Sequence, residues 1–172
     1  IHFESELGVG TTFYITLPFR VDPNPPKAES AKPEQAASIK GAHILLVEDN
    51  ELNMEISQYI LEGAGAIVAQ AWNGKEAVRR FSESEPGTFD CILMDVMMPL
   101  MDGLEATRTI RAMQRPDAAT IPIVAMTANT FSEDEQRSRE AGMNLFLNKP
   151  VDSGKMLQTV LECLKMGGEN AL

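Results

Sequence analysis

Five short apolar runs, each followed by a segment with helical spacing, constrain the fold of this chain most. The runs cover residues 43–47, 66–71, 91–94, 121–126 and 145–147. Continuous apolarity, rather than alternation, is typical of strands that are covered on both faces. We therefore predict an α/β fold in which five strand–helix units form a parallel sheet with helices on both sides.

The segments between and after these runs have the apolar spacing of amphipathic helices. We predict helices over residues 51–62, 73–84, 104–113, 132–141 and 153–166. Side chains able to cap a helix stand at the start of four of them, namely Asn50, Asn73, Ser132 and Ser153. Strand and helix thus alternate through the whole second part of the chain.

The first 41 residues have a different composition. Residues 1–3 and 12–19 are strand-like, and two glycines interrupt the pattern between them. Residues 20–41 carry four of the ten prolines and almost no large apolar side chain, which is typical of an extended linker. We therefore divide the chain into a segment 1–19, a linker 20–41, a domain 42–166 and a tail 167–172.

Charge and cysteine content exclude several classes of function. A formal net charge of −10 argues against nucleic acid and anionic membrane as partners, since both require a basic surface. Both cysteines, Cys91 and Cys163, lie in apolar patterns and are predicted to be free core residues in a reducing compartment, the cytoplasm. The chain begins without Met or a secretory pattern, so we expect a piece of a longer protein.

Polar side chains follow four of the predicted strands. Glu48 and Asp49, then Asp95, Thr127 and Lys149, stand where the strands end, and ligands of open parallel sheets bind at that edge. Each has an ordinary explanation when taken alone. The acidic pair suits the positive end of a helix, and the others suit solvated loops. Their convergence on one edge favours a functional site.

Three neighbouring carboxylates repel one another and raise each other's pKa, unless a cation lies among them. Hard oxygen ligands indicate Mg²⁺. The lysine is then available for a second anion, and a phosphoryl group fits, because the metal and the ammonium neutralise its oxygens while the hydroxyl donates a hydrogen bond. The remaining oxygen of Asp95 becomes an in-line nucleophile that forms an aspartyl phosphate.

Four motifs carry a family resemblance: "LLVEDN" (45–50), "ILMDVMMPLMDG" (92–103), "AMTAN" (125–129) and "LNKP" (147–150). In this order and separation, residues 42–166 resemble a receiver domain, the phosphoacceptor module of two-component signalling. The resemblance implies a doubly wound, flavodoxin-like fold with five parallel strands in the order 2-1-3-4-5. It also implies a cis peptide bond before Pro150.

The resemblance further implies a role for each site residue. Asp95 is the implied phosphoacceptor. The implied ligands of Mg²⁺ are Asp49, Asp95 and the backbone carbonyl of Met97, while Glu48 acts mainly through water.

On the same resemblance, Lys149 contacts the phosphoryl oxygens and Thr127 hydrogen-bonds one of them after phosphorylation. Phe146 occupies the switch-aromatic position. Many relatives have tyrosine there, so an output that needs the tyrosine hydroxyl is in doubt.

Further stretches resemble a subtype. "EDNELN" and "MTANTF" are similar to receivers of hybrid histidine kinases, and "SELGVGTTFYITLPF" (5–19) resembles the last strands of a histidine-kinase ATP-binding domain. The implied parent is a phosphotransferase. This piece lacks the nucleotide-contacting boxes, so we expect it to catalyse only its own phosphorylation and dephosphorylation. The implied phosphodonor is a phosphohistidine of a histidine kinase, on another segment or protein.

In similar proteins the first helix of the receiver docks on a histidine phosphotransfer protein. Leu52 and Ile56 fit either that interface or a core-facing stripe, whereas Asn53 distinguishes the two. Three other functions stay open: a phosphorylation-independent interaction module, a stand-alone response regulator, and a phosphatase of small phosphoesters. Such phosphatases present a second aspartate two residues after the nucleophile, where this chain has Met97.

Overall fold

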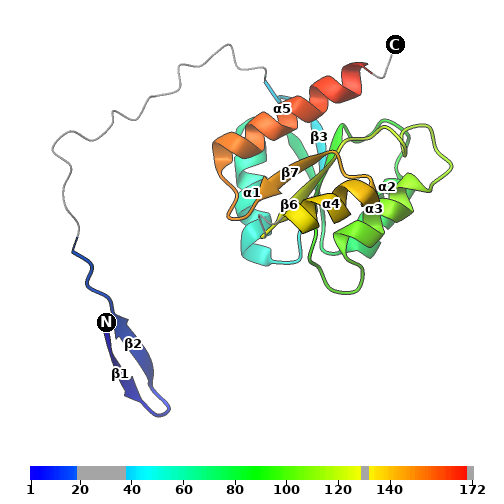
Figure 1. The fold of residues 1–172 in the computed structure, drawn as a ribbon. Helices are drawn as coiled ribbons and strands as arrows, with labels where there is room; N and C mark the ends of the chain where they lie inside the picture. The colour runs from blue at the N-terminus through cyan, green and yellow to red at the C-terminus, as the bar shows by residue number, and fades with distance from the viewer. Residues whose placement is uncertain (19–37, 129–131, 170–172) are drawn as a thin grey trace. The chain divides into compact units, whose positions relative to one another are not determined.

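The computed structural model describes residues 1–18, 38–128 and 132–169. The chain separates into two compact units, Ile1–Ala36 and Ala37–Leu172 (Figure 1). We refer to the second as the α/β unit.

The first unit contains an antiparallel hairpin of β1 (His2–Glu6) and β2 (Gly10–Tyr14). His2 pairs with Tyr14 across the hairpin, and their rings stack with 4.5 Å between centroids. Two strands were expected here, although Phe19, the expected end of the second, lies outside the described residues. The apolar side chains Phe3 and Phe13 are exposed, so the hairpin buries little of its own apolar surface.

The α/β unit is built on one parallel sheet of five strands. The strands are β3 (His43–Val47), β4 (Ile67–Ala71), β5 (Cys91–Asp95), β6 (Ile123–Thr127) and β7 (Leu145–Asn148). Their order across the sheet is β4-β3-β5-β6-β7, which is the predicted flavodoxin-like order 2-1-3-4-5 counted within this unit. The predicted cis peptide bond between Lys149 and Pro150 is present.

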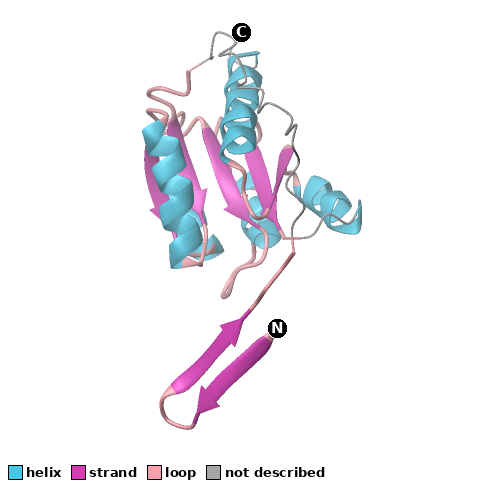
Figure 2. Cartoon of the chain, turned by 90° about the vertical axis from the view of Figure 1, so that its left-hand side faces the viewer, coloured by secondary structure: helices cyan, strands magenta, loops and turns pink. Residues whose placement is uncertain are grey.

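Five helices connect and cover the strands (Figure 2). They are α1 (Glu51–Gly63), α2 (Gly74–Glu83), α3 (Gly103–Arg111), α4 (Ser132–Ala141) and α5 (Ser153–Glu169). Buried side chains of α1 and α5 pack on one face of the sheet, whereas those of α2, α3 and α4 pack on the other. The helices on both faces confirm the predicted doubly wound architecture.

The two cores explain why the strands read as continuous apolar runs. Successive side chains of a strand point to opposite faces. In β3, Leu45 and Val47 join the core under α2 and α3, while Ile44 and Leu46 join the core under α1 and α5. All four are fully buried, so neither face of the strand tolerates a polar residue.

The helix caps agree with the sequence in two cases. The side chain of Asn50 accepts a hydrogen bond from the backbone N–H of Asn53, and Asn73 caps α2 in the same way. The prediction that Ser153 caps α5 is wrong. The helix begins at Ser153 itself, and the carboxylate of Asp152 accepts from the N–H of Lys155 at 2.9 Å. The side chain of Ser132 lies outside the described residues.

Ile39 belongs to the α/β unit. It lies inside the range predicted as linker, yet only 3% of its surface is exposed and it packs in the core beside α1 and α5. The packed unit therefore starts a few residues before the composition changes.

Cys91 and Cys163 are buried free thiols, as predicted. The neighbouring thiol of Cys163, together with burial, raises the pKa of Cys91 well above its ordinary value. None of the described helices combines the length and the apolar character that a membrane span requires.

Candidate functional site

Four strands deliver the predicted site residues to one edge of the sheet. Asp95 and Thr127 are the last residues of β5 and β6, while Glu48 and Lys149 directly follow β3 and β7. Because the strands are parallel and in register, their carboxyl ends lie at the same edge. The predicted convergence of distant segments is therefore present in the structure.

Lys149 connects two of the carboxylates. Its ammonium nitrogen lies 2.6 Å from Oε2 of Glu48 and 2.6 Å from Oδ2 of Asp95. Only 1% of the surface of Glu48 and 4% of that of Asp95 is exposed. The sequence placed these groups at one edge, but did not show that one cation serves two buried anions.

The local backbone fixes the position of Asp95. Its Oδ1 accepts a hydrogen bond from the N–H of Met97 at 3.1 Å, so both of its oxygens have a partner. The N–H of Gly103 donates to the carbonyl of Val96, which brings the start of α3 against the end of β5. A Cβ atom at residue 103 would lie 2.2 Å from the carbonyl oxygen of Asp95. Only glycine fits this approach.

The electrostatic balance differs between the two partners of the ion pair. Burial, helped by the negative charge of Glu48, raises the pKa of Asp95 despite the hydrogen bonds from Lys149 and Met97. Burial alone would lower the pKa of Lys149, but its hydrogen bonds to Asp95 and Glu48 outweigh this effect and raise it. The ammonium of Lys149 has two carboxylate partners, whereas Asp95 has to share its ammonium partner with Glu48.

The carboxylates form a set of metal-ligating size. Glu48, Asp49 and Asp95 each offer one oxygen, and these oxygens lie within 4.8 Å of one another. Glu48 and Asp95 are buried, while Asp49 is exposed. Two buried carboxylates and an exposed one at the mouth are the hard donors that Mg²⁺ prefers, and the exposed side leaves room for water ligands. The donor set therefore fits the predicted ion.

Thr127 and Met97 lie beside this set. Thr127 is buried, and its carbonyl accepts a hydrogen bond from the backbone N–H of Lys149 at 2.7 Å. Both residues line a cavity of about 60 Å³, together with Arg137 of α4. The side chain of Met97 is 77% exposed, so it does not fill the core.

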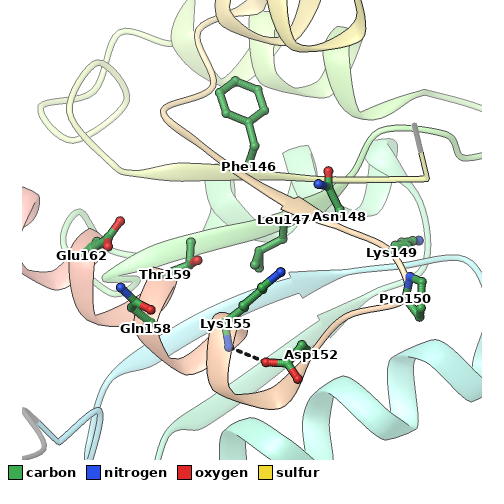
Figure 3. A pocket seen from close by; sticks show the side chains of 10 residues that line it. All are labelled: Phe146, Leu147, Asn148, Lys149, Pro150, Asp152, Lys155, Gln158, Thr159 and Glu162. Atoms are coloured by element: carbon green, nitrogen blue, oxygen red, sulfur yellow. Dashed lines mark hydrogen bonds between the residues drawn. The ribbon is translucent and has the colours of Figure 1, made fainter. Parts of the chain in front are cut away.

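Phe146 lies on β7, three residues before Lys149. The guanidinium of Arg139, on α4, lies 4.8 Å from the centre of its ring, a cation–π distance. Phe146 and Lys149 also line a cavity of about 470 Å³ between β7 and α5 (Figure 3). In that view the ring of Phe146 points away from Lys155 and Asp152.

Sequence reasoning missed one contact of the site. The side-chain amide of Asn53 donates to Oε1 of Glu48 at 3.1 Å, so the residue predicted to touch a partner also touches the acidic set. A local rule indicates this contact, because Asn53 is the third residue of a helix capped by Asn50. Side chains at this position reach back toward the cap.

The exposures along α1 show whether Leu52 and Ile56 face the core or the solvent. Leu52, Ile56 and Tyr59 are 64%, 48% and 82% exposed, whereas Met54 and Leu61 are fully buried. Leu52 and Ile56, which fitted either an interface or a core-facing stripe, therefore face solvent, whereas the neighbouring Ile60 packs against the core.

Comparison with known proteins places this geometry in a family. The response regulator receiver domain family matches residues 44–161. This chain belongs to that family. The receiver domain is the α/β unit described above, and the four strand ends carry the residues of its acidic edge.

Curated relatives of the receiver domain are histidine kinases. The chain is 34% identical over 158 residues to Histidine kinase 1 of Arabidopsis thaliana, a match that covers 74% of this chain and 13% of that protein. It is 35% identical over 138 residues to the sensor histidine kinase GacS of Pseudomonas protegens, covering 80% and 15%. The chain thus spans less than a fifth of these relatives.

Solved structures agree with the receiver fold. One is the receiver domain of the sensor histidine kinase PA1611 from Pseudomonas aeruginosa, with a magnesium ion coordinated in its active-site cleft. It is 35% identical, with a TM-score of 0.66, covering 73% of this chain and 98% of that one. Another is the receiver domain of Ssk1 in a co-crystal with the Saccharomyces cerevisiae histidine phosphotransfer protein Ypd1, 30% identical, with a TM-score of 0.66, covering 74% and 91%.

Proposed function

We propose that this receiver domain accepts a phosphoryl group from a phosphohistidine onto Asp95. It then passes the group to a histidine phosphotransfer protein or releases it by hydrolysis. One observation carries the proposal: a buried carboxylate at the end of β5 is held by Lys149 and by the N–H of Met97, beside two further carboxylates. An isolated structural ion pair needs no such surplus of negative charge.

Glu48, Asp49 and Asp95 are the side chains that would hold Mg²⁺, and the backbone carbonyl of Met97 is a fourth proposed ligand. The magnesium-bound receiver of PA1611 supports this assignment. When bound, Mg²⁺ supplies charge neutralisation for the oxygens of the transferring group.

The residues of the chain have separate tasks in the transfer. A carboxylate oxygen of Asp95 attacks the phosphorus atom, a P–O bond forms, and the P–N bond to the histidine breaks with its electron pair returning to the imidazole nitrogen. Lys149 is already within contact distance of Asp95 and remains beside the incoming oxygens. Thr127 donates its hydroxyl to one of these oxygens once Asp95 carries the group.

Phe146 is the proposed switch residue. Its ring lies under the guanidinium of Arg139, and it has no hydroxyl with which to respond to a movement of Thr127. Any switching therefore acts through ring packing, as a shift between states of the β7 and α4 surface.

The exposed stripe of α1 is the proposed docking surface for the phosphotransfer partner. Leu52, Ile56 and Tyr59 present apolar side chains to solvent on the helix whose Asn53 contacts Glu48 of the acidic set. The co-crystal of a related receiver with Ypd1 supports a partner of this class.

We further propose that the parent is a hybrid histidine kinase, with residues 1–19 as the end of its ATP-binding domain, 20–41 as linker, 42–166 as receiver and 167–172 as tail. The kinase relatives support this origin. The exposed Phe3 and Phe13 of the hairpin fit a fragment that packs within a larger domain. Free buried thiols fit a cytoplasmic, reducing location.

Intact-mass measurement tests the phosphoacceptor role. The whole chain is incubated with Mg²⁺ and acetyl phosphate, and we expect the added mass of one phosphoryl group on wild type and none on Asp95→Asn. Stoichiometric labelling of the variant would place the phosphoacceptor elsewhere. Absence of labelling on wild type, while a control receiver is labelled, would favour a phosphorylation-independent interaction module.

A further inference from the structure

Asn53 belongs to two surfaces at once. It is exposed in the first turn of α1, beside the apolar stripe, and its side-chain amide donates to Oε1 of Glu48 at 3.1 Å. The same carboxylate gives its other oxygen, Oε2, to Lys149 at 2.6 Å. The backbone N–H of Asn50 also approaches Oε1, at a longer 3.4 Å. Asn53 and Lys149 therefore each bind one oxygen of the Glu48 carboxylate and together fix its orientation.

The two donors, Lys149 and Asn53, have different effects on the binding of a cation by Glu48. Lys149 carries a positive charge, so its attraction for Glu48 competes with a metal ion for the same carboxylate. The amide of Asn53 is neutral, and it holds one oxygen without cancelling the negative charge that Mg²⁺ requires. Glu48 is almost completely buried, so removing the amide takes a hydrogen-bond donor away from a buried carboxylate.

We propose that Asn53 is a positioning residue, which orients the carboxylate of Glu48 toward a cation bound with Asp49 and Asp95, against the pull of Lys149. The inference rests on the proposed metal-dependent phosphoacceptor function and adds to it a determinant of metal affinity. Groups that orient a ligand set typically contribute about 10- to 100-fold to metal affinity. Here the orienting group stands on the helix that carries the proposed docking surface.

A purely structural role for Asn53 predicts a different result. The backbone N–H of Asn53 donates to the capping side chain of Asn50 at 3.1 Å, and this contact is kept when the side chain is shortened. Asn53→Ala therefore retains the start of α1 and removes only the contact with Glu48. If that contact serves the helix alone, its loss lowers stability and leaves Mg²⁺ affinity unchanged.

Calorimetric titration of the whole chain with MgCl₂ alone separates these cases. We expect Asn53→Ala to weaken Mg²⁺ binding about 10-fold, and Asn53→Gln, which keeps an amide donor, to recover part of the loss. Gln58→Ala is the matched control. It removes a side-chain amide from the same helix, and the hydrogen-bond partners of that amide are Glu62 and Gln70. Equal Mg²⁺ affinity of wild type and Asn53→Ala, or an equal loss in Gln58→Ala, overturns the proposal.

Labelling with acetyl phosphate provides the second measurement. We expect Asn53→Ala to need about 10-fold more Mg²⁺ for its half-maximal rate and to reach the wild-type rate at saturating Mg²⁺. A lower maximal rate with unchanged metal dependence contradicts a positioning role. If wild type neither binds Mg²⁺ nor becomes labelled, the proposed function itself fails. Labelled wild type with no effect of Asn53→Ala removes only this inference.

Discussion

Two partly buried clusters of charged side chains lie at opposite ends of the parallel sheet. At the amino ends, Arg115 and Asp117 form a one-to-one pair, with 2.6 Å from Nε to Oδ1 and 2.9 Å from Nη2 to Oδ2. At the carboxyl ends, Lys149 is shared between Glu48 and Asp95. Each cluster is well hydrogen-bonded, so geometry alone does not separate them.

The charge balance separates them. The hydrogen bonds from Arg115 lower the pKa of Asp117, and the pKa of Arg115 is raised in turn. Both ionised forms are therefore favoured by folding. The pKa of Asp95 is raised instead, because burial and Glu48 outweigh its share of Lys149. An ion pair in which folding favours both charged forms stabilises the fold. A buried carboxylate whose charged form is disfavoured by folding indicates a functional site.

The largest expected effect of this difference is on phosphorylation. Lys149→Ala removes the ammonium that faces the incoming phosphoryl oxygens, and we expect the labelling rate to fall about 100-fold. Mg²⁺ affinity should be largely retained, because the carboxylates remain and lose a competing cation.

Rates of acetyl phosphate labelling and a Mg²⁺ titration check this prediction. Lys155→Ala is the control, since Lys155 lines the same cavity as Lys149 (Figure 3), whereas the ammonium 2.6 Å from Asp95 is that of Lys149. Loss of metal affinity with a normal labelling rate would assign Lys149 to the metal site instead.

The opposite cluster is expected to affect stability and not phosphorylation. Arg115→Met removes the ion pair with Asp117 and the hydrogen bond to the carbonyl of Ser84, at 3.1 Å. We expect the free energy of unfolding to fall by about 2 kcal/mol, measured by urea denaturation, with labelling unchanged. Arg108→Met, at an exposed position of α3, should stay within about 0.5 kcal/mol of wild type. A labelling defect in Arg115→Met would remove the distinction between the two clusters.

The sequence predicted the parts that depend on local pattern and chain order. Strand runs, helix ranges and the residues at the carboxyl edge followed from periodicity and from the geometry of parallel sheets. Periodicity shows which residues share a face, but it does not say which face the sheet covers, so the exposure of Leu52, Ile56 and Tyr59 remained open. Met54 and Leu61, which fill the core instead, belong to the same helix.

Contacts between distant side chains were beyond the sequence. The two carboxylates that share Lys149 lie 101 and 54 residues away from it in the chain. Their distances depend on the pairing of four adjacent strands, β3, β5, β6 and β7. Ile39 was missed for a related reason, because a single apolar residue at the end of a polar linker carries no periodic pattern.

A smaller expected effect concerns Asp95 itself. Asp95→Asn removes a negative charge that burial and Glu48 disfavour, so in metal-free buffer we expect the free energy of unfolding to rise. Urea denaturation in the presence of a chelator measures it. The free energy of unfolding should rise less in Asp49→Asn, because Asp49 is exposed. A less stable Asp95→Asn would mean that Lys149 compensates the buried charge in full.

The smallest effect is the pH dependence of stability, which should have opposite sign in the two clusters. The folded pKa of Asp95 lies above its ordinary value of 3.8, so its contribution to stability is most favourable below that value and is lost as pH rises through the folded pKa. The advantage of Asp95→Asn over wild type should therefore be complete at pH 7 and shrink as pH falls.

The folded pKa of Asp117 lies below 3.8, so its stabilisation is present above that value and is lost only as pH falls through the folded pKa. The deficit of Asp117→Asn should therefore stay constant from pH 7 down to about 5, below which the unfolded carboxyl group begins to protonate. Urea denaturation of both variants and wild type across this range, without metal, measures the two differences. Because each variant is compared with wild type at the same pH, general acid destabilisation cancels. Parallel slopes would show that the surplus of carboxylate at the carboxyl edge does not distinguish it from a structural ion pair.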